Sequence, residues 1–511
     1  MIKSEIIKVE PQTQERFFNA IKNNDIEKVK NIVESEVLII DNNCINNALI
    51  VVLKKENWEM VKYLIDKGAD ANTEYEYNYN KSKTALIIAS EKENLEMVKY
   101  LVEHGADVNA KNKSGKTALI MASEKGNLEI VKYLVEHSAS DINFALLNAA
   151  INENLEMVKY LVECGADVDV KSSSYKTALI IASEKGNLEI AKYLIEKGAS
   201  NINSALLSAT INGNVEIVKY LVDEGADVNT KSNRGNTVLI TASEKGNLEI
   251  VKCLVEHGAD NVDRALMAAS RKGYSEIVNC LLKNGIDYIN EALLDAAVGG
   301  NLELVKYLVE NGADVNTKYD NGSTALMEAS QYGNLEIVKY LVENGAESIN
   351  KALRIASING NLELVKYLIE HGADVNTKYD NGSTALMEAS RFGKLGVVKC
   401  LVENGADIDA KNNDGKTALI IASENRNLRV VAYFIENGID INAQYDYCND
   451  KKYYRGLTIL MIASSDGHLD IVKYLIQKGA DVNIEDCRCN TALDFARNVE
   501  IEEVLKEAGA M

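Results

Sequence analysis

Residues 117–136 read Thr-Ala-Leu-Ile-Met-Ala-Ser-Glu-Lys-Gly-Asn-Leu-Glu-Ile-Val-Lys-Tyr-Leu-Val-Glu, and they contain two short amphipathic patterns divided by a glycine. Thr117 stands where a helix N-cap belongs, and Gly126 stands where the first helix should stop. Small and apolar residues recur at helical spacing on two stripes, which are Leu119, Ala122 and Ser123, then Leu128, Val131, Leu134 and Val135. The stretch therefore predicts two short helices, each with one buried face.

The pattern recurs along nearly the whole chain of 511 residues. A Gly-Ala-Asp-like segment that ends each copy returns mostly every 33 or 27 residues, and a period of 20–50 residues predicts a solenoid. Residues 316–330 and 376–390 are identical, so copying of a 60-residue pair of repeats explains part of the similarity.

Three motifs resemble the ankyrin repeat: Thr117-Ala-Leu-Ile, Gly126-Asn-Leu-Glu-Ile-Val and Gly105-Ala-Asp-Val-Asn. The resemblance covers about residues 14–509 in sixteen repeats, and the mixture of lengths is similar to the large ankyrin families of giant DNA viruses and AT-rich microbes. Alanine replaces the family proline, and isoleucine or methionine replaces the family histidine. The usual Thr–His hydrogen bonding is therefore expected to be absent.

The resemblance implies an all-α fold, a solenoid of paired antiparallel helices with β-hairpin fingers only at the long repeats. Fingers are expected around 73–83, 110–116, 170–176, 230–236, 317–323, 377–383, 410–416, 443–457 and 484–490. Tight turns are expected at 138–144, 198–204, 258–264, 285–291 and 345–351.

The predicted organisation is an N-terminal tail over 1–13 and one continuous array over 14–511. Cap repeats are expected at about 14–37 and 488–511, because the helices there turn polar on one edge. The polar substitutions are Lys28 and Asn31 at one end and Glu502 and Lys506 at the other. The Ile/Tyr edge of each internal second helix should face the preceding repeat.

The composition argues against several classes of function. A net charge of −20 and a pI near 4.9 argue against nucleic acid or an anionic membrane as the main partner. No apolar run reaches the roughly 18 residues of a membrane span, and the eight irregularly placed cysteines are not a secreted disulfide framework. We expect a cytoplasmic monomer, in the host-cell cytoplasm if the source is viral.

No pattern for catalysis, cofactor binding or metal binding stands out. Four of the five histidines precede the Gly or Ser that ends a repeat, where they can bond the last helix carbonyls. Cys448, Cys487 and Cys489 lack the spacing of a zinc site. We expect a protein that is not an enzyme and has no cofactor.

Asparagines end several of the Gly-Ala-Asp-Val-Asn segments. The ankyrin resemblance implies that such residues are candidates for β-hydroxylation by a 2-oxoglutarate oxygenase. A turn asparagine bonded to its local backbone is the simpler interpretation. The candidates are Asn109, Asn229, Asn316 and Asn376.

The leading functional hypothesis is a scaffold that binds a partner protein through a concave groove and the finger tips. The alternatives are a substrate-recruiting adaptor of a ubiquitin ligase and a structural or cytoskeletal linker. Exposed Tyr and Arg are typical interface anchors, and acidic groups favour a partner with a basic segment. The predicted groove residues are Asp295, Glu328, Tyr332, Glu388, Arg391 and Phe392. The predicted finger residues are Tyr75, Tyr77, Tyr79, Tyr319, Tyr379, Tyr445, Tyr447, Tyr453 and Tyr454.

Overall fold

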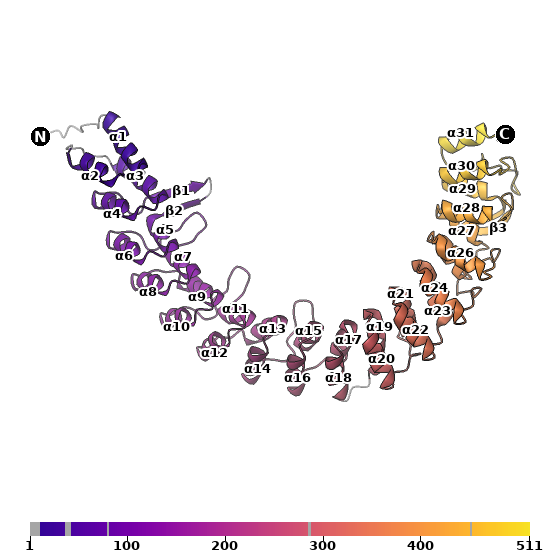
Figure 1. Ribbon diagram of the computed structural model, residues 1–511, viewed down its shortest axis with the longest axis horizontal. Coiled ribbons are helices and arrows are strands. Elements are labelled where there is room, and N and C mark those ends of the chain that lie inside the picture. Colours follow the sequence, from indigo (N-terminus) through magenta and orange to yellow (C-terminus); the bar gives the residue numbers. More distant parts are fainter. Residues whose placement is uncertain (1–10, 36–41, 79–80, 285–287, 450–451) are drawn as a thin grey trace. The chain divides into compact units, whose positions relative to one another are not determined.

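The computed structural model describes residues 11–35, 42–78, 81–284, 288–449 and 452–511. Contacts divide the chain into an N-terminal half, Met1–Asp260, and a C-terminal half, Asn261–Met511. Within each half, successive helix pairs pack side by side (Figure 1). The fold is an all-α solenoid, as predicted, while a single continuous array over 14–511 stays a prediction.

Each repeat except the last contributes a first helix and a second helix. The first helices of the full-length repeats are α5 Ala85–Glu91, α7 Ala118–Lys125, α11 Ala178–Lys185, α15 Val238–Lys245, α21 Ala325–Tyr332, α25 Ala385–Arg391, α27 Ala418–Glu424 and α29 Ile459–Asp466. Those of the short repeats are α9 Ile142–Ile151, α13 Ile202–Asn212, α17 Val262–Lys272, α19 Ile289–Gly299 and α23 Ile349–Asn359, and the chain opens with α1 Pro11–Lys22 and α3 Asn42–Lys54.

The second helices form the other row of each half. They are α2 Ile26–Ser35, α4 Trp58–Asp66, α6 Leu95–Glu103, α8 Leu128–Glu136, α10 Leu155–Glu163, α12 Leu188–Glu196, α14 Val215–Asp223, α16 Leu248–Glu256, α18 Ser275–Lys283, α20 Leu302–Glu310, α22 Leu335–Glu343, α24 Leu362–Glu370, α26 Leu395–Glu403, α28 Leu428–Glu436, α30 Leu469–Gln477 and α31 Val499–Glu507. Leucine, valine and alanine on the facing sides of the two rows form the buried core.

The two repeat lengths start their first helices differently. In full-length repeats a threonine caps the helix, as where Thr117 Oγ1 accepts the Ile120 N–H at 3.4 Å. In short repeats the helix begins three residues earlier relative to the apolar stripe, and no side chain caps it, as at Asp141 before α9. The predicted tight turns at 138–144 and its equivalents are therefore shorter than expected, because one helical turn takes up part of each. Residues 285–287 lie outside the described residues.

Asparagines that precede the second helices link neighbouring repeats. Asn214, before α14, donates from Nδ2 to the Ser183 carbonyl of the preceding repeat at 2.6 Å, and Asn427 does the same to Ser390 at 2.8 Å. Tyrosines of the second helices add a link in the same direction, as Tyr100 donates to the Lys62 carbonyl at 3.0 Å. The Tyr edge therefore faces the preceding repeat, as predicted.

The glycine that ends a first helix leaves room for this asparagine. Gly273 ends α17 with a φ of +80°, and a Cβ there would lie 2.4 Å from Asn301 Oδ1. Both the left-handed backbone and the close approach require glycine.

Fingers occur at the long repeats, as predicted. Paired strands are found within the described residues only in the two enlarged fingers: β1 Glu74–Asn78 with β2 Lys81–Thr84, and β3 Tyr445–Asn449 with β4 Lys452–Leu457, both antiparallel. The seven-residue fingers close as tight turns, in which the Gly115 N–H donates to Asn112 at 2.8 Å. They have too few residues for a ladder, and one isolated bridge joins Lys231 to Thr237.

The last repeat departs from the predicted helix pair. Residues 491–498 form turns in place of a first helix, because Asp494 accepts hydrogen bonds from both the backbone N–H and the hydroxyl of Thr491. The Arg497 N–H bonds the Ser464 carbonyl of α29. At the polar edges, Lys28 and Lys506 are exposed. Among the described residues, no helix combines the length and the apolar character needed to cross a bilayer.

Candidate functional site

Two of the predicted groove carboxylates are buried and paired with arginines of the same chain. Asp295 in α19 accepts hydrogen bonds from Nε (3.0 Å) and Nη2 of Arg271 in α17. Glu388 in α25 accepts from Nε and Nη2 of Arg354 in α23, at 3.2 and 2.9 Å. Their negative charge is already balanced, so neither is an open acceptor for a basic partner.

Neither arginine was predicted from the sequence as part of the groove. They lie in first helices next to those of the carboxylates, 24 residues before Asp295 and 34 residues before Glu388. An opposite charge in the adjacent first helix was the available sequence signal. Which charged side chains pair depends on how far one first helix is displaced along the next, and only the structure shows this displacement.

Tyr319 and Tyr379 brace these pairs and are not exposed anchors. Tyr319 donates to the Glu291 carbonyl and to Asp295 Oδ2, each at 3.3 Å. Tyr379 donates to the Asn350 carbonyl at 3.0 Å, and the Arg354 guanidinium lies 4.9 Å from its ring centroid. Burial raises the pKa of both hydroxyls above the ordinary value of 10.

The remaining groove residues reach the surface. Tyr332 at the end of α21 is 60% exposed and Phe392 just after α25 is 50% exposed. Arg391 is exposed beside Phe392, and Glu328 is half-buried and close enough to raise the pKa of Asp295 in addition to the effect of burial. We call Tyr332, Arg391 and Phe392 the aromatic patch.

The enlarged finger at 443–457 differs from the exposed cluster that was expected. Tyr447 is buried, stacks on Tyr454 at 5.5 Å between ring centroids, and lies under Lys416. Burial raises the pKa of Tyr445 to about 12. Tyr79 and the side chains of Tyr75, Tyr77 and Tyr453 lie outside the described residues.

The short repeats create a feature that was not predicted from the sequence. Over α9 and over α23, which belong to repeats without a finger, the two flanking fingers stand apart, and we call each of these spaces a finger gap. The gap over α23, between fingers 317–323 and 377–383, has a volume of about 690 Å³. The gap over α9, between fingers 110–116 and 170–176, has a volume of about 670 Å³. The 27-residue period was the sequence signal for this space, because each short repeat lacks the finger that would otherwise fill it.

Comparison with known families gives the identity of the repeat. A family model described as ankyrin repeats (3 copies) matches eight overlapping stretches that run from residue 17 to residue 445. A second, for ankyrin repeats (many copies), matches 448–496. The chain belongs to the ankyrin-repeat family. No curated protein matches it. Ankyrin-repeat proteins are in general non-enzymatic modules of protein–protein interaction.

The candidate hydroxylation sites use their side chains to join successive ankyrin repeats. Asn109 donates from Nδ2 to the Ser138 carbonyl at 3.1 Å, while its Oδ1 accepts the Ser140 N–H at 2.8 Å. The Oδ1 atoms of the other three candidates accept the equivalent N–H of the next repeat. The simpler interpretation of a purely local turn was therefore incomplete, and hydroxylation stays a prediction.

The four histidines that precede the Gly or Ser at the end of a repeat bond the last helix carbonyls, as expected from their positions. His104 and His137 place Nδ1 2.7 Å from the carbonyls of Tyr100 and Tyr133. Cys487 and Cys489 are exposed, and the described part of the chain contains no group of three or more His, Cys, Asp or Glu placed to hold a metal ion.

Proposed function

We propose that this chain is a non-enzymatic cytoplasmic scaffold that binds a partner protein through its first helices and fingers, with the aromatic patch as an anchor. The observation that carries the proposal is the exposure of Tyr332 and Phe392 at positions 60 residues apart, on the first helices that flank α23. Exposed aromatic side chains bury a large area with few torsions to order, so they supply much of the binding energy at interfaces.

The surface beside the patch is held in place before a partner arrives. Arg354 is fixed by Glu388 and by the ring of Tyr379, and all three residues lie at the finger gap over α23 or beside it. Ordered side chains lose little entropy on binding, which supports a binding role for this surface.

A partner with a basic segment remains part of the proposal, in a weaker form. Asp295 and Glu388 are balanced by arginines, so Glu328 is the one predicted groove carboxylate whose side chain has no hydrogen bond or ion pair among the described residues. A monomeric state is also proposed. An adaptor of a ubiquitin ligase and a structural linker remain alternatives that no specific contact favours.

The test is affinity capture with mass spectrometry from the native cell, using the wild-type chain and a Tyr332→Ala, Phe392→Ala variant. Both side chains are at least half exposed, so the variant should fold normally. We expect the captured partner to be reduced about tenfold or more. Tyr274→Ala, which removes an exposed tyrosine before α18, is the matched control.

Undiminished capture by the folded double variant would contradict the anchor. The basic segment is tested separately by Glu328→Lys, since Glu388→Lys would bury a lysine against Arg354 and disturb the fold. Capture that is unchanged by Glu328→Lys, and insensitive to salt, would remove the basic segment from the proposal.

A further inference from the structure

The finger gap over α9 has an apolar floor. Leu147 lines it, and Phe144 and Ile151 lie on either side in the same helix, 49% and 46% exposed. Large apolar side chains half exposed in a concave space of about 670 Å³ are typical of a binding pocket.

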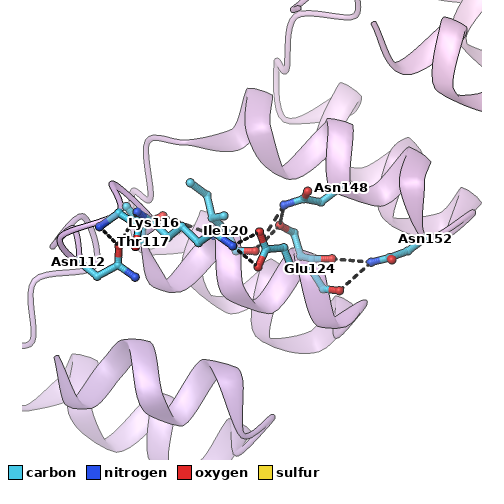
Figure 2. Close-up of polar contacts among 9 residues, drawn as sticks. Asn112, Lys116, Thr117, Ile120, Glu124, Asn148 and Asn152 are labelled. Carbon is cyan, nitrogen blue, oxygen red and sulfur yellow. Dashed lines mark hydrogen bonds and ion pairs between the residues drawn. The ribbon is translucent and has the colours of Figure 1, made fainter. Parts of the chain in front are cut away.

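The walls and floor of this gap are fixed by hydrogen bonds (Figure 2). Asn148 in α9 donates to Ser123 Oγ at 2.9 Å, and Asn152 donates to the Ser123 carbonyl at 2.9 Å, so α9 is held against α7. Lys116 at the base of one finger bonds Glu124 at 2.7 Å. Lys176 bonds Glu184 in the same way at the base of the other finger. The space is therefore preformed.

Tyr175 stands at the tip of one wall in a strained conformation. Its φ is +62°, and its side chain is 80% exposed. The corresponding tip residue of the finger at 110–116 is Gly115, which takes the same left-handed region without a Cβ. A non-glycine residue in this conformation costs stability, and a side chain that is 80% exposed buries too little area to offset the cost, which is the pattern of a residue that serves binding.

The charge around the gap is opposite to that of the chain as a whole. Four lysines and three carboxylates line it, namely Lys111, Lys116, Lys176 and Lys185 with Glu124, Asp141 and Glu184. Lys185 is exposed and has no ion-pair partner among the described residues. In a chain of net charge −20, this local excess of positive charge selects an acidic ligand.

The other large gap has a different floor. In α23, Lys351 and Arg354 take the places of Phe144 and Leu147, and in α13 a serine, Ser204, takes the place of Phe144. The apolar floor therefore distinguishes the gap over α9 from its copies.

We propose that the finger gap over α9 binds an extended segment of a partner protein that inserts a large apolar side chain against Phe144, Leu147 and Ile151 and places a carboxylate at Lys185. This site rests on the proposed scaffold function, and it names the chemistry of a partner segment in the N-terminal half.

The experiment is a selection of random 12-residue peptides displayed on phage against the immobilised full-length chain. We expect recovered peptides to share an aromatic or large aliphatic residue within about three positions of Asp or Glu. Synthetic copies should bind Phe144→Ser, Ile151→Ser at least about tenfold more weakly, and Lys185→Glu more weakly with a reduced salt dependence. Ile211→Ser, at the position equivalent to Ile151 in α13, is the matched control.

Tyr175→Gly is a variant whose loss of binding could not be explained by unfolding. Glycine adopts a positive φ without strain, so the substitution should not destabilise the finger. We expect it to weaken peptide binding as well. Recovery of a basic consensus, recovery of no consensus, or binding unchanged in the gap variants would overturn the inference. Peptides whose binding is removed by Tyr332→Ala, Phe392→Ala and not by the gap variants would also overturn it, while leaving the proposed function standing.

Discussion

Asp295 shows how this fold holds a carboxylate inside its first-helix row. Burial raises the pKa of Asp295 above its ordinary value of 3.8, although the hydrogen bonds from Arg271 oppose the rise. The folded chain therefore binds this proton more tightly than the unfolded chain does. The contribution of Asp295 to stability is greatest below pH 3.8 and is lost as the pH rises through the folded-state pKa.

Arg271→Ala should destabilise α17 and α19 by about 2 kcal/mol at pH 7, because it leaves a buried carboxylate without its main partner. The loss should become smaller as the pH is lowered, because Asp295 then takes up a proton and the uncompensated charge disappears. Hydrogen exchange of the backbone amides of α17 and α19 measures both effects.

Asp295→Asn is the control for this experiment. It removes the buried charge while Arg271, whose side chain is 60% exposed, stays solvated, so the change should be under about 1 kcal/mol. A loss as large as that of Arg271→Ala would contradict the account.

At the scale of the element, helix caps were the most predictable feature. The sequence predicts Thr117 as a cap and Gly126 as a stop, and the structure confirms both. The sequence did not predict that the short repeats extend their first helices at the N-terminal end. No capping residue marks the start of the extra turn, and packing against the neighbouring first helices stabilises it. The missing first helix of the last repeat depends on Asp494 and Arg497, whose bonds no periodicity reveals.

The side chain of His468 does not cap α30, whereas asparagine caps some of the equivalent second helices, such as α8 and α10. Its Nδ1 is buried with no hydrogen-bond partner among the described residues, and burial lowers its pKa below the ordinary 6.5. At the equivalent position, Asn127 Oδ1 accepts the Ile130 N–H at 3.1 Å.

His468→Asn should therefore stabilise α29 and α30 by about 1 kcal/mol. Because the unfolded chain protonates His468 more readily, the wild-type protein loses stability as the pH falls through 6.5. The advantage of the variant should grow between pH 7 and pH 5. Hydrogen exchange in α29 and α30 at the two pH values provides the measurement, and a difference that is equal at both would argue against the buried histidine.

At the scale of the whole molecule, the main helix contacts join each repeat to its nearest neighbours. A defect in one repeat should therefore weaken its neighbours and leave distant repeats unchanged. The chain has one tryptophan, Trp58 in α4, which reports on the N-terminal half alone.

Phe434→Ala in α28 removes one of the largest fully buried side chains and should cost about 3–5 kcal/mol locally. Amides in α27–α30 should lose protection, while the urea midpoint followed by Trp58 fluorescence stays the same. Leu64→Ala, in the helix of Trp58, is the control that should lower that midpoint. A Trp58 midpoint that moves equally with both would indicate one cooperative unit.

The candidate site was less predictable than the fold. The aromatic patch was visible as exposed Tyr and Phe at helix ends, and the structure places Tyr332 and Phe392 at the surface. The pairing of Glu388 with Arg354 and the gap over α9 could not be derived, because both depend on how far one first helix is displaced along the next. Periodicity fixes which residues lie inside, whereas this displacement decides which polar groups meet.

The two identical segments at 316–330 and 376–390 have a consequence for the gene. Unequal crossing-over between the DNA that encodes them would insert or delete 60 codons, which is one full-length and one short repeat. The new junction would pair helices whose facing surfaces are already complementary. The shortened or lengthened protein would therefore still fold. Each such event would add or remove one finger gap. The number of binding sites would therefore change by one at a time, and every intermediate protein would remain folded.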